Sequence, residues 1–257
     1  MGAYLTRMRA AGRSPGTVNL HRHYLTQLRD VRRSPWSVTT EDMLELMAVK
    51  AWAAETRKSA RTVWRGFYRW GHGVGLVAVD PALELPPVTV PAGVPRPTPE
   101  HLVRRLLKHP DERIGLMAML AAYGGLRAGE IARVHPGRDL VEDLLLVHGK
   151  GAREREVPIL EPYLLWRLQR IEGWAFPNGQ GSHLSPGHVS RLLSREMPEG
   201  WTAHTLRHRC ASQAYAGTRN LFAVSKLLGH SRVETTQRYT RLPAEDVRAA
   251  VAAASGL

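Results

Sequence analysis

The chain has 257 residues, 43% of them hydrophobic, which suits one large or two modest folded domains and argues against a disordered protein. Lysine and arginine number 36 against 23 acidic residues, and the net charge of +13 favours a polyanionic partner such as nucleic acid. The alternative is that the charge only aids solubility. The single cysteine, Cys210, excludes an intramolecular disulfide and a cysteine-based metal cluster.

Residues 1–82 are predicted to form a small helical domain with four helices. Ser14 followed by Pro15 signals the start of the second helix, which should run to about Val31. Thr40 precedes two acidic residues, which suit the positive end of a third helix.

The fourth helix, expected over 56–70, is the most informative part of this domain. Its apolar face contains Val63, Trp64, Phe67 and Trp70. Arginine recurs every fourth residue on another face, at Arg57, Arg61, Arg65 and Arg69. Because like charges at this spacing repel, the row either lies along a DNA duplex or is a solvated face, and both interpretations stay open.

A proline-rich linker is predicted over 83–97. In polyproline geometry the stretch from Pro86 to Pro97 would span about 35 Å, enough to pass around a DNA duplex. Two domains could then clamp the DNA, although composition is equally consistent with a plain spacer.

Residues 98–257 are predicted to form a larger domain, mainly α-helical with a small antiparallel β-sheet. Its almost wholly apolar helix over 114–122 should be buried and should end at Gly124-Gly125. Segments 144–147 and 154–159 flank a glycine-rich turn and predict a β-hairpin. Further helices are expected at 100–107, 162–171, 186–195 and 243–254.

Several side chains in this domain suit phosphodiester cleavage without a metal. That reaction needs positive donors for the phosphate oxygens, an in-line nucleophile, and a proton for the leaving oxygen. The candidates are Arg127, Arg207 and His230 as donors, Tyr239 as nucleophile, His204 as general base and Lys150 as general acid. Each residue alone also has an ordinary structural explanation. His204 and His208 have the spacing of a zinc pair, but no acidic or cysteine partner lies at a metal-like spacing, so no metal is expected.

The order and spacing of the set resemble the tyrosine site-specific recombinases, which include phage integrases and chromosome-dimer resolvases. The segment from Gly125 to Ile131, with Arg127 and Glu130, is similar to the family's first-arginine box. Gly149-Lys150-Gly151, followed by Arg153, Arg155 and Val157-Pro158, is similar to its hairpin lysine. The stretches His204 to His208 and Leu228 to Tyr239 are similar to its second box and its nucleophile box.

The resemblance implies a helical core-binding domain joined to an α+β catalytic domain, together gripping a double-stranded DNA core site. Tyr239 would attack the scissile phosphate and form a 3′-phosphotyrosine, without ATP, metal or cofactor. Four protomers on two DNA sites would exchange strands through a Holliday junction, while the free protein would be a monomer or weak oligomer. The helix over 244–254 could dock on a neighbouring protomer or pack within its own. Glu130 and His208 would support the catalytic residues, and the expected DNA contacts are Arg57, Arg61, Arg65, Arg69, Arg153 and Arg155.

Two departures from the family pattern stand out. The stretch after the first box, Ala132 to Gly137, lacks a tryptophan-acid pattern, and Arg153 replaces a second lysine, which leaves Lys150 alone as acid.

No segment of the chain corresponds to an arm-binding domain, and no apolar run has membrane-spanning length. The favoured function is a phage or mobile-element integrase acting in viral genome integration, in the cytoplasm of a bacterial host and associated with its nucleoid. The alternatives are a chromosome or plasmid dimer resolvase, a type IB topoisomerase, or a non-catalytic DNA-binding regulator.

Overall fold

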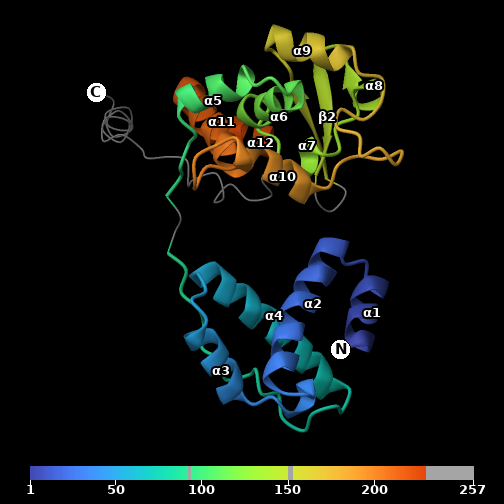
Figure 1. The fold of residues 1–257 in the computed structure, drawn as a ribbon, viewed down its shortest axis with the longest axis vertical. Coiled ribbons are helices and arrows are strands. Elements are labelled where there is room, and N and C mark those ends of the chain that lie inside the picture. The colour runs from blue at the N-terminus through green and yellow to red at the C-terminus, as the bar shows by residue number, and fades with distance from the viewer. Residues whose placement is uncertain (92–93, 150–152, 230–257) are drawn as a thin grey trace, which may run out of the picture. The chain divides into compact units, whose positions relative to one another are not determined.

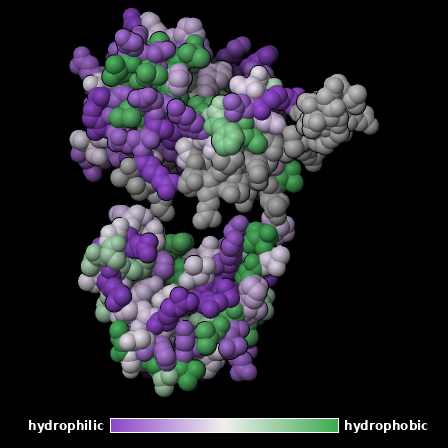
Figure 2. Space-filling view, turned by 180° about the vertical axis from the view of Figure 1, so that it is seen from behind, coloured by the Kyte–Doolittle hydropathy of each residue, from purple (hydrophilic) through white to green (hydrophobic). Residues whose placement is uncertain are grey.

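The structure is a computed structural model that describes residues 1–91, 94–149 and 153–229. The chain divides into two compact units, Met1–Ala92 and Gly93–Leu257 (Figure 1). Hydrophilic residues cover much of the face that Figure 2 shows of each unit, with apolar residues scattered among them. Among the described residues, no helix is long and apolar enough to cross a membrane.

The first unit is wholly helical in its described residues, as predicted. Its elements are α1 (Gly2–Ala10), α2 (Pro15–Val31), a short 3₁₀ helix (Pro35–Ser37), α3 (Thr40–Val49) and α4 (Ala54–Gly73). The predicted starts are confirmed by their caps: the hydroxyl of Ser14 accepts a hydrogen bond from the Thr17 amide at 3.3 Å. At α3, Thr39 caps the helix, and Asp42 completes the capping box by accepting from the Thr39 amide at 2.9 Å.

Aromatic side chains fill the core of the first unit. Trp64 and Phe67 of α4 are fully buried, and the Trp64 indole donates to the Tyr24 carbonyl at 3.2 Å. Trp36 stacks on Phe67 with ring centroids 4.9 Å apart. Position 71 must be glycine, because a Cβ there would lie 2.8 Å from the Trp36 ring.

The predicted linker over 83–97 is packed at both of its ends, each against its own unit. Leu85 is buried in the core of the first unit, and its carbonyl accepts hydrogen bonds from Arg61 at 2.8 and 3.0 Å. In the second unit, the Arg96 guanidinium lies over the Trp201 ring at 4.2 Å, and the Thr98 hydroxyl donates to Thr205 at 2.8 Å. Both ends of the predicted linker are therefore part of a folded unit.

The second unit combines helices with one small sheet, which confirms the predicted fold class. Its elements are α5 (Glu100–Leu107), α6 (Glu112–Ala122), α7 (Ala128–Ile131), α8 (Pro136–Asp139), β1 (Leu140–Val141), β2 (Leu144–His148), β3 (Glu154–Pro158), α9 (Pro162–Gln169), α10 (Pro186–Arg195), α11 (Ala203–Thr218) and α12 (Leu221–Leu228). The sheet is antiparallel with strand order β1-β2-β3, and Leu145 pairs with Val157. The predicted hairpin is confirmed, whereas the two-residue strand β1 has no signal in the sequence.

The core of this unit surrounds α6, in which every residue from Ile114 to Ala122 is buried, as predicted. Helices α5 and α11 pack against α6, and the sheet adds Leu145 and Val157 to the same core. Helix α12 packs against α11 and β3. The end of α12 therefore lies against the turn that follows α6 and against β3. The predicted helix over 243–254 lies outside the described residues.

Candidate active site

A tight turn at the end of α6 sets the position of Arg127. Gly125 has a φ of +65°, and a Cβ there would lie 2.8 Å from Leu228 and 3.1 Å from the sulfur of Cys210. Only glycine satisfies both the left-handed backbone and this close approach. The turn places Arg127 immediately before α7, where its side chain is 45% exposed.

Glu130 is the centre of the site, although it is almost completely buried, with 4% of its surface exposed. One carboxylate oxygen accepts from the Arg127 amide at 2.9 Å, and the other from the Arg127 guanidinium at 2.8 Å. Arg155 of β3 reaches the same carboxylate with two hydrogen bonds, of 3.1 and 2.9 Å. Burial by itself raises the pKa of Glu130, but the hydrogen bonds and charge of Arg155 and the donors of Arg127 outweigh it and lower the pKa to about 2.

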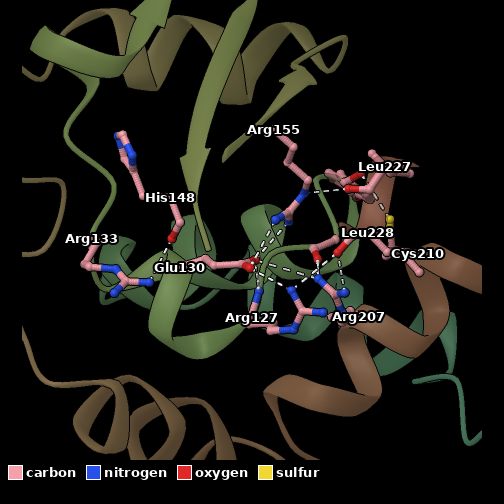
Figure 3. Close-up of polar contacts among 11 residues, drawn as sticks. Arg127, Glu130, Arg133, His148, Arg155, Arg207, Cys210, Leu227 and Leu228 are labelled. Carbon is pink, nitrogen blue, oxygen red and sulfur yellow. Dashed lines mark hydrogen bonds and ion pairs between the residues drawn. The ribbon is translucent and has the colours of Figure 1, made fainter. Parts of the chain in front are cut away.

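Arg207 approaches Glu130 from α11 (Figure 3). It is 1% exposed, and its guanidinium lies 3.7 Å from the Glu130 carboxylate. It donates to the carbonyl of Gly125 and, at 2.6 Å, to the carbonyl of Leu228. Three arginines therefore surround one carboxylate and the last carbonyls of α12, where the negative end of the helix dipole lies. We call Arg127, Arg155 and Arg207 with Glu130 the arginine cluster.

His204 and His208 lie one turn apart on α11, with their Nε2 atoms 3.0 Å from each other. The Arg96 amide donates to Nδ1 of His208 at 3.3 Å, which ties this ring to the segment before α5. Partial burial lowers the pKa of His204, and the charges of Arg207 and Arg127 lower it further. The ring is thereby kept neutral, which is the form that a general base requires.

The base of the β2–β3 hairpin is fixed by contacts that sequence patterns did not reveal. The Gly149 amide donates to the Arg153 carbonyl at 2.7 Å. Arg133 donates to the His148 carbonyl at 2.8 Å (Figure 3). The His148 ring lies between Asp139, at 3.1 Å, and Glu154, at 2.8 Å. Neither Arg133 nor His148 belongs to a recognisable motif, so only the fold could identify them.

The structure brings together four of the residues predicted from the sequence, namely the arginine cluster. His204 and His208 contact each other on α11, while Lys150, His230 and Tyr239 lie outside the described residues. Arg153 is exposed, and Arg155 is almost buried, with 9% of its side chain exposed. Within the described parts of the chain, no three His, Cys, Asp or Glu side chains gather as metal ligands would.

The arginines of α4 belong to the first unit. Arg69 is exposed, Arg57 and Arg65 are partly exposed, and Arg61 is bound to the Leu85 carbonyl. The pKa of Arg61 is lowered, first by partial burial and then by the charge of Arg65. Their predicted DNA contacts stay predictions.

Comparison with known proteins gives consistent matches. The phage integrase family matches residues 98–245. The chain is 29% identical over 274 residues to tyrosine recombinase XerC of Neisseria meningitidis (serogroup C, serotype 2a), covering 93% of this chain and 90% of that protein. It is 33% identical over 198 residues to XerC of Azotobacter vinelandii, covering 69% of this chain and 66% of that protein. The fold is similar to that of a lambda integrase dimer bound to a COC′ core site, with a TM-score of 0.76, 18% identity and 93% of each chain covered.

Proposed function

The chain belongs to the phage integrase family of tyrosine recombinases, enzymes that cleave and rejoin DNA, and we propose that it is a site-specific recombinase that resolves joined copies of a bacterial chromosome or plasmid. The observation that carries this proposal is the similarity to XerC proteins, which extends over 93% of the chain and so includes both units. It supports dimer resolution better than the phage-integrase function favoured by the sequence alone. In this proposal the enzyme acts on chromosomal DNA in the bacterial cytoplasm.

The first chemical step is attack by Tyr239 on the scissile phosphate. The phenol has an ordinary pKa of about 10, so it must lose its proton as it attacks, and His204 accepts it. The new phosphorus–oxygen bond forms as the bond to the 5′ oxygen breaks, and Lys150 gives that oxygen a proton. Attack by a 5′-hydroxyl of the second DNA reverses the step, which leaves the number of phosphodiester bonds unchanged and requires no ATP.

In this proposal Arg127 and His230 bind the phosphate oxygens during both steps, and Arg207, which is 1% exposed, contributes positive charge from within the protein. Arg127 suits this role because nearly half of its side chain is exposed and its orientation is already fixed by Glu130. Arg207 is buried, and its charge lowers the pKa of the base His204. Two sites and four protomers complete the reaction, since each DNA duplex has two strands to exchange.

A covalent-capture experiment tests this function and finds the DNA site at the same time. The purified protein is incubated with fragmented DNA of the organism that carries the gene and quenched with detergent, and the covalently bound fragments are sequenced. Tyr239→Phe serves as the matched control, since it removes only the nucleophilic oxygen. We expect one short sequence to be enriched, located once per chromosome or plasmid, and no enrichment with the variant.

Other outcomes identify the alternatives. Enrichment of a site next to the gene itself, within a mobile element, would favour an integrase. Adducts distributed over all sequences would favour a topoisomerase, and specific binding with no adduct would favour a regulator. A plasmid that carries two direct copies of the enriched site then tests recombination: resolution into two circles is expected.

A further inference from the structure

Arg155 is in a position that its sequence pattern does not predict. We infer that Arg155 is a positioning residue, which ties the β2–β3 hairpin to the end of α12, and that it does not bind DNA phosphate. The inference replaces the DNA contact expected from the sequence and rests on the family's cleavage reaction.

The contacts of Arg155 account for all three nitrogens of its guanidinium. Two nitrogens donate to the two carboxylate oxygens of Glu130, at 3.1 and 2.9 Å, and Nε donates to the Leu227 carbonyl at 2.7 Å. Its side chain is 9% exposed. A phosphate would have to displace a buried carboxylate to obtain the same paired geometry, so a DNA contact is unfavourable.

These contacts join three segments that lie far apart in the sequence. Arg155 itself is in β3, and in the sequence Lys150 lies between β2 and β3. Glu130 is in α7, next to Arg127, and Leu227 is in the last turn of α12 (Figure 3). The chain continues from α12 through Gly229 to His230. One side chain therefore connects the strands that bear the predicted acid with the helix that leads to the nucleophile box.

The residue that caps the C-terminus of α12 lies against this guanidinium. Gly229 ends the helix with a φ of +62°, and a Cβ at this position would lie 3.0 Å from Cδ and 3.1 Å from Nη1 of Arg155. Backbone and guanidinium are thus in close contact. A shift of Arg155 would move the point at which the chain leaves α12, and misplacement of reacting groups by about 1 Å can slow a reaction by about 100-fold.

Only arginine satisfies this position. Its planar fork binds both oxygens of Glu130 while Nε remains available for a third acceptor at the side. A lysine would preserve the charge but could not hold both partners in the same geometry. Arg155→Lys therefore separates positioning from charge.

Arg153 provides a matched comparison two residues earlier. Its side chain is exposed, and its carbonyl accepts the hydrogen bond from Gly149 that closes the base of the hairpin. Arg153, which directly precedes β3, remains the candidate for phosphate binding in this hairpin. Loss of one phosphate contact reduces the salt dependence of DNA binding by about 0.9 in slope.

The first experiment compares binding with cleavage on a core site obtained by the covalent capture. We expect Arg155→Gln and Arg155→Lys to leave the salt slope of DNA affinity unchanged but to slow adduct formation at saturating DNA by about 100-fold and about 10-fold. Arg153→Gln should reduce the slope by about 0.9. If Arg155→Gln lowered the slope by the same amount and formed adduct at the wild-type rate, Arg155 would be a phosphate contact and the inference would be overturned.

Chemical rescue distinguishes a positioning role of Arg155 in cleavage from a role in stability alone. Arg155 lines an open groove of about 890 Å³ between the sheet and α12, so a small cation can reach the space left by Arg155→Ala. Millimolar guanidinium should restore part of the adduct rate of this variant, whereas sodium chloride of equal ionic strength should not. Failure of any guanidinium rescue, together with a cleavage loss that follows only the unfolded fraction of the protein, would overturn the positioning role.

Hydrogen exchange of the free protein tests the connection independently of any DNA site. In Arg155→Gln the amides of 154–158 and 221–229 should both exchange faster, whereas Arg153→Gln should change neither segment. If the wild-type protein formed no adduct with any DNA, the proposed recombination function would be wrong, but this exchange pattern would still support the connection of β3 to α12 through Arg155. Unchanged exchange in 221–229 would overturn that connection.

Discussion

The two units of this recombinase use arginine in opposite ways. On α4 of the first unit, Arg57, Arg61, Arg65 and Arg69 follow one another on a single helix face, and the charge of Arg65 lowers the pKa of Arg61. In the second unit, Arg127, Arg155 and Arg207 come from different elements and converge on Glu130. The first arrangement places like charges next to one another on one helix, and the second holds charge inside the protein by pairing it with a carboxylate. The same residue type therefore forms a row along one helix in the first unit and a paired cluster in the second.

Among the substitutions that distinguish the two arrangements, removal of the Glu130 carboxylate should have the largest effect on stability. Glu130→Gln leaves Arg155 and Arg207 buried without their negative partner, and breaking a buried ion pair in this way costs about 3–5 kcal/mol. We expect urea unfolding of the second unit to show a loss of this size.

Asp42→Asn is the matched control in the first unit. Asp42 also pairs with an arginine, Arg32, but that side chain is 52% exposed and gains water when the pair is lost. A loss of about 1 kcal/mol is expected, mainly from the capping box. Equal losses of stability for the two variants would show that burial does not increase the contribution of the ion pairs in the arginine cluster.

Acid should weaken the arginine cluster over a defined range of pH. The folded-state pKa of Glu130 is about 2, against an ordinary value of 4.5, so the stabilisation is fully present above pH 4.5 and is lost as pH falls towards 2. The free energy of unfolding should decrease by on the order of 3 kcal/mol across this range.

Urea titrations of wild-type protein and Glu130→Gln at several pH values between 5 and 2 measure this contribution. The variant has no carboxyl group at this position, so its stability should depend less steeply on pH. Asp42 has a pKa of about 2 in both proteins and provides a common background. Parallel curves for the two proteins would contradict a low pKa for Glu130.

Arg61 should contribute to stability rather than to binding. Its Nε and one terminal nitrogen donate to the Leu85 carbonyl at 3.0 and 2.8 Å, which fastens the start of the linker to α4. Arg61→Met retains the apolar stem and removes these hydrogen bonds, at an expected cost of about 1.5 kcal/mol in thermal or urea unfolding of the first unit. Arg69→Met, at an exposed position of the same helix, should change stability by less than about 0.5 kcal/mol.

The contrast between the units also explains which features sequence reasoning could reach. Periodicity within one element predicted α4 and its arginine row, because residues four apart on a helix share a face whatever surrounds them. The buried helix α6 and the hairpin were predictable for the same reason, since apolar runs and glycine-rich turns act locally.

The arginine cluster depends instead on contacts between elements. Arg155 differs from Arg153 by two positions in the sequence, yet the first binds Glu130 and the second is exposed. No local pattern separates them, because the difference arises from the packing of α7 and α12 against β3. For the same reason Arg61 could not be distinguished from Arg69: its partner, the Leu85 carbonyl, is a backbone atom with no sequence signature.

The smallest expected effect concerns DNA binding by α4. If the exposed part of the row contacts phosphate, Arg69→Gln should weaken binding and reduce the salt slope of log affinity by about 0.9, because one fewer counterion is released. Arg61→Gln removes the same charge from the same helix, but its guanidinium is held by Leu85, so the slope should stay close to that of the wild-type protein. Both affinities are measured on one core site from about 50 to 200 mM salt, below the temperature at which either variant unfolds. A reduced slope for Arg61→Gln would mean that DNA draws this side chain away from Leu85. An unchanged slope for Arg69→Gln would show that the row is a solvated face, and the contrast between a binding surface on α4 and a paired cluster in the active site would no longer hold.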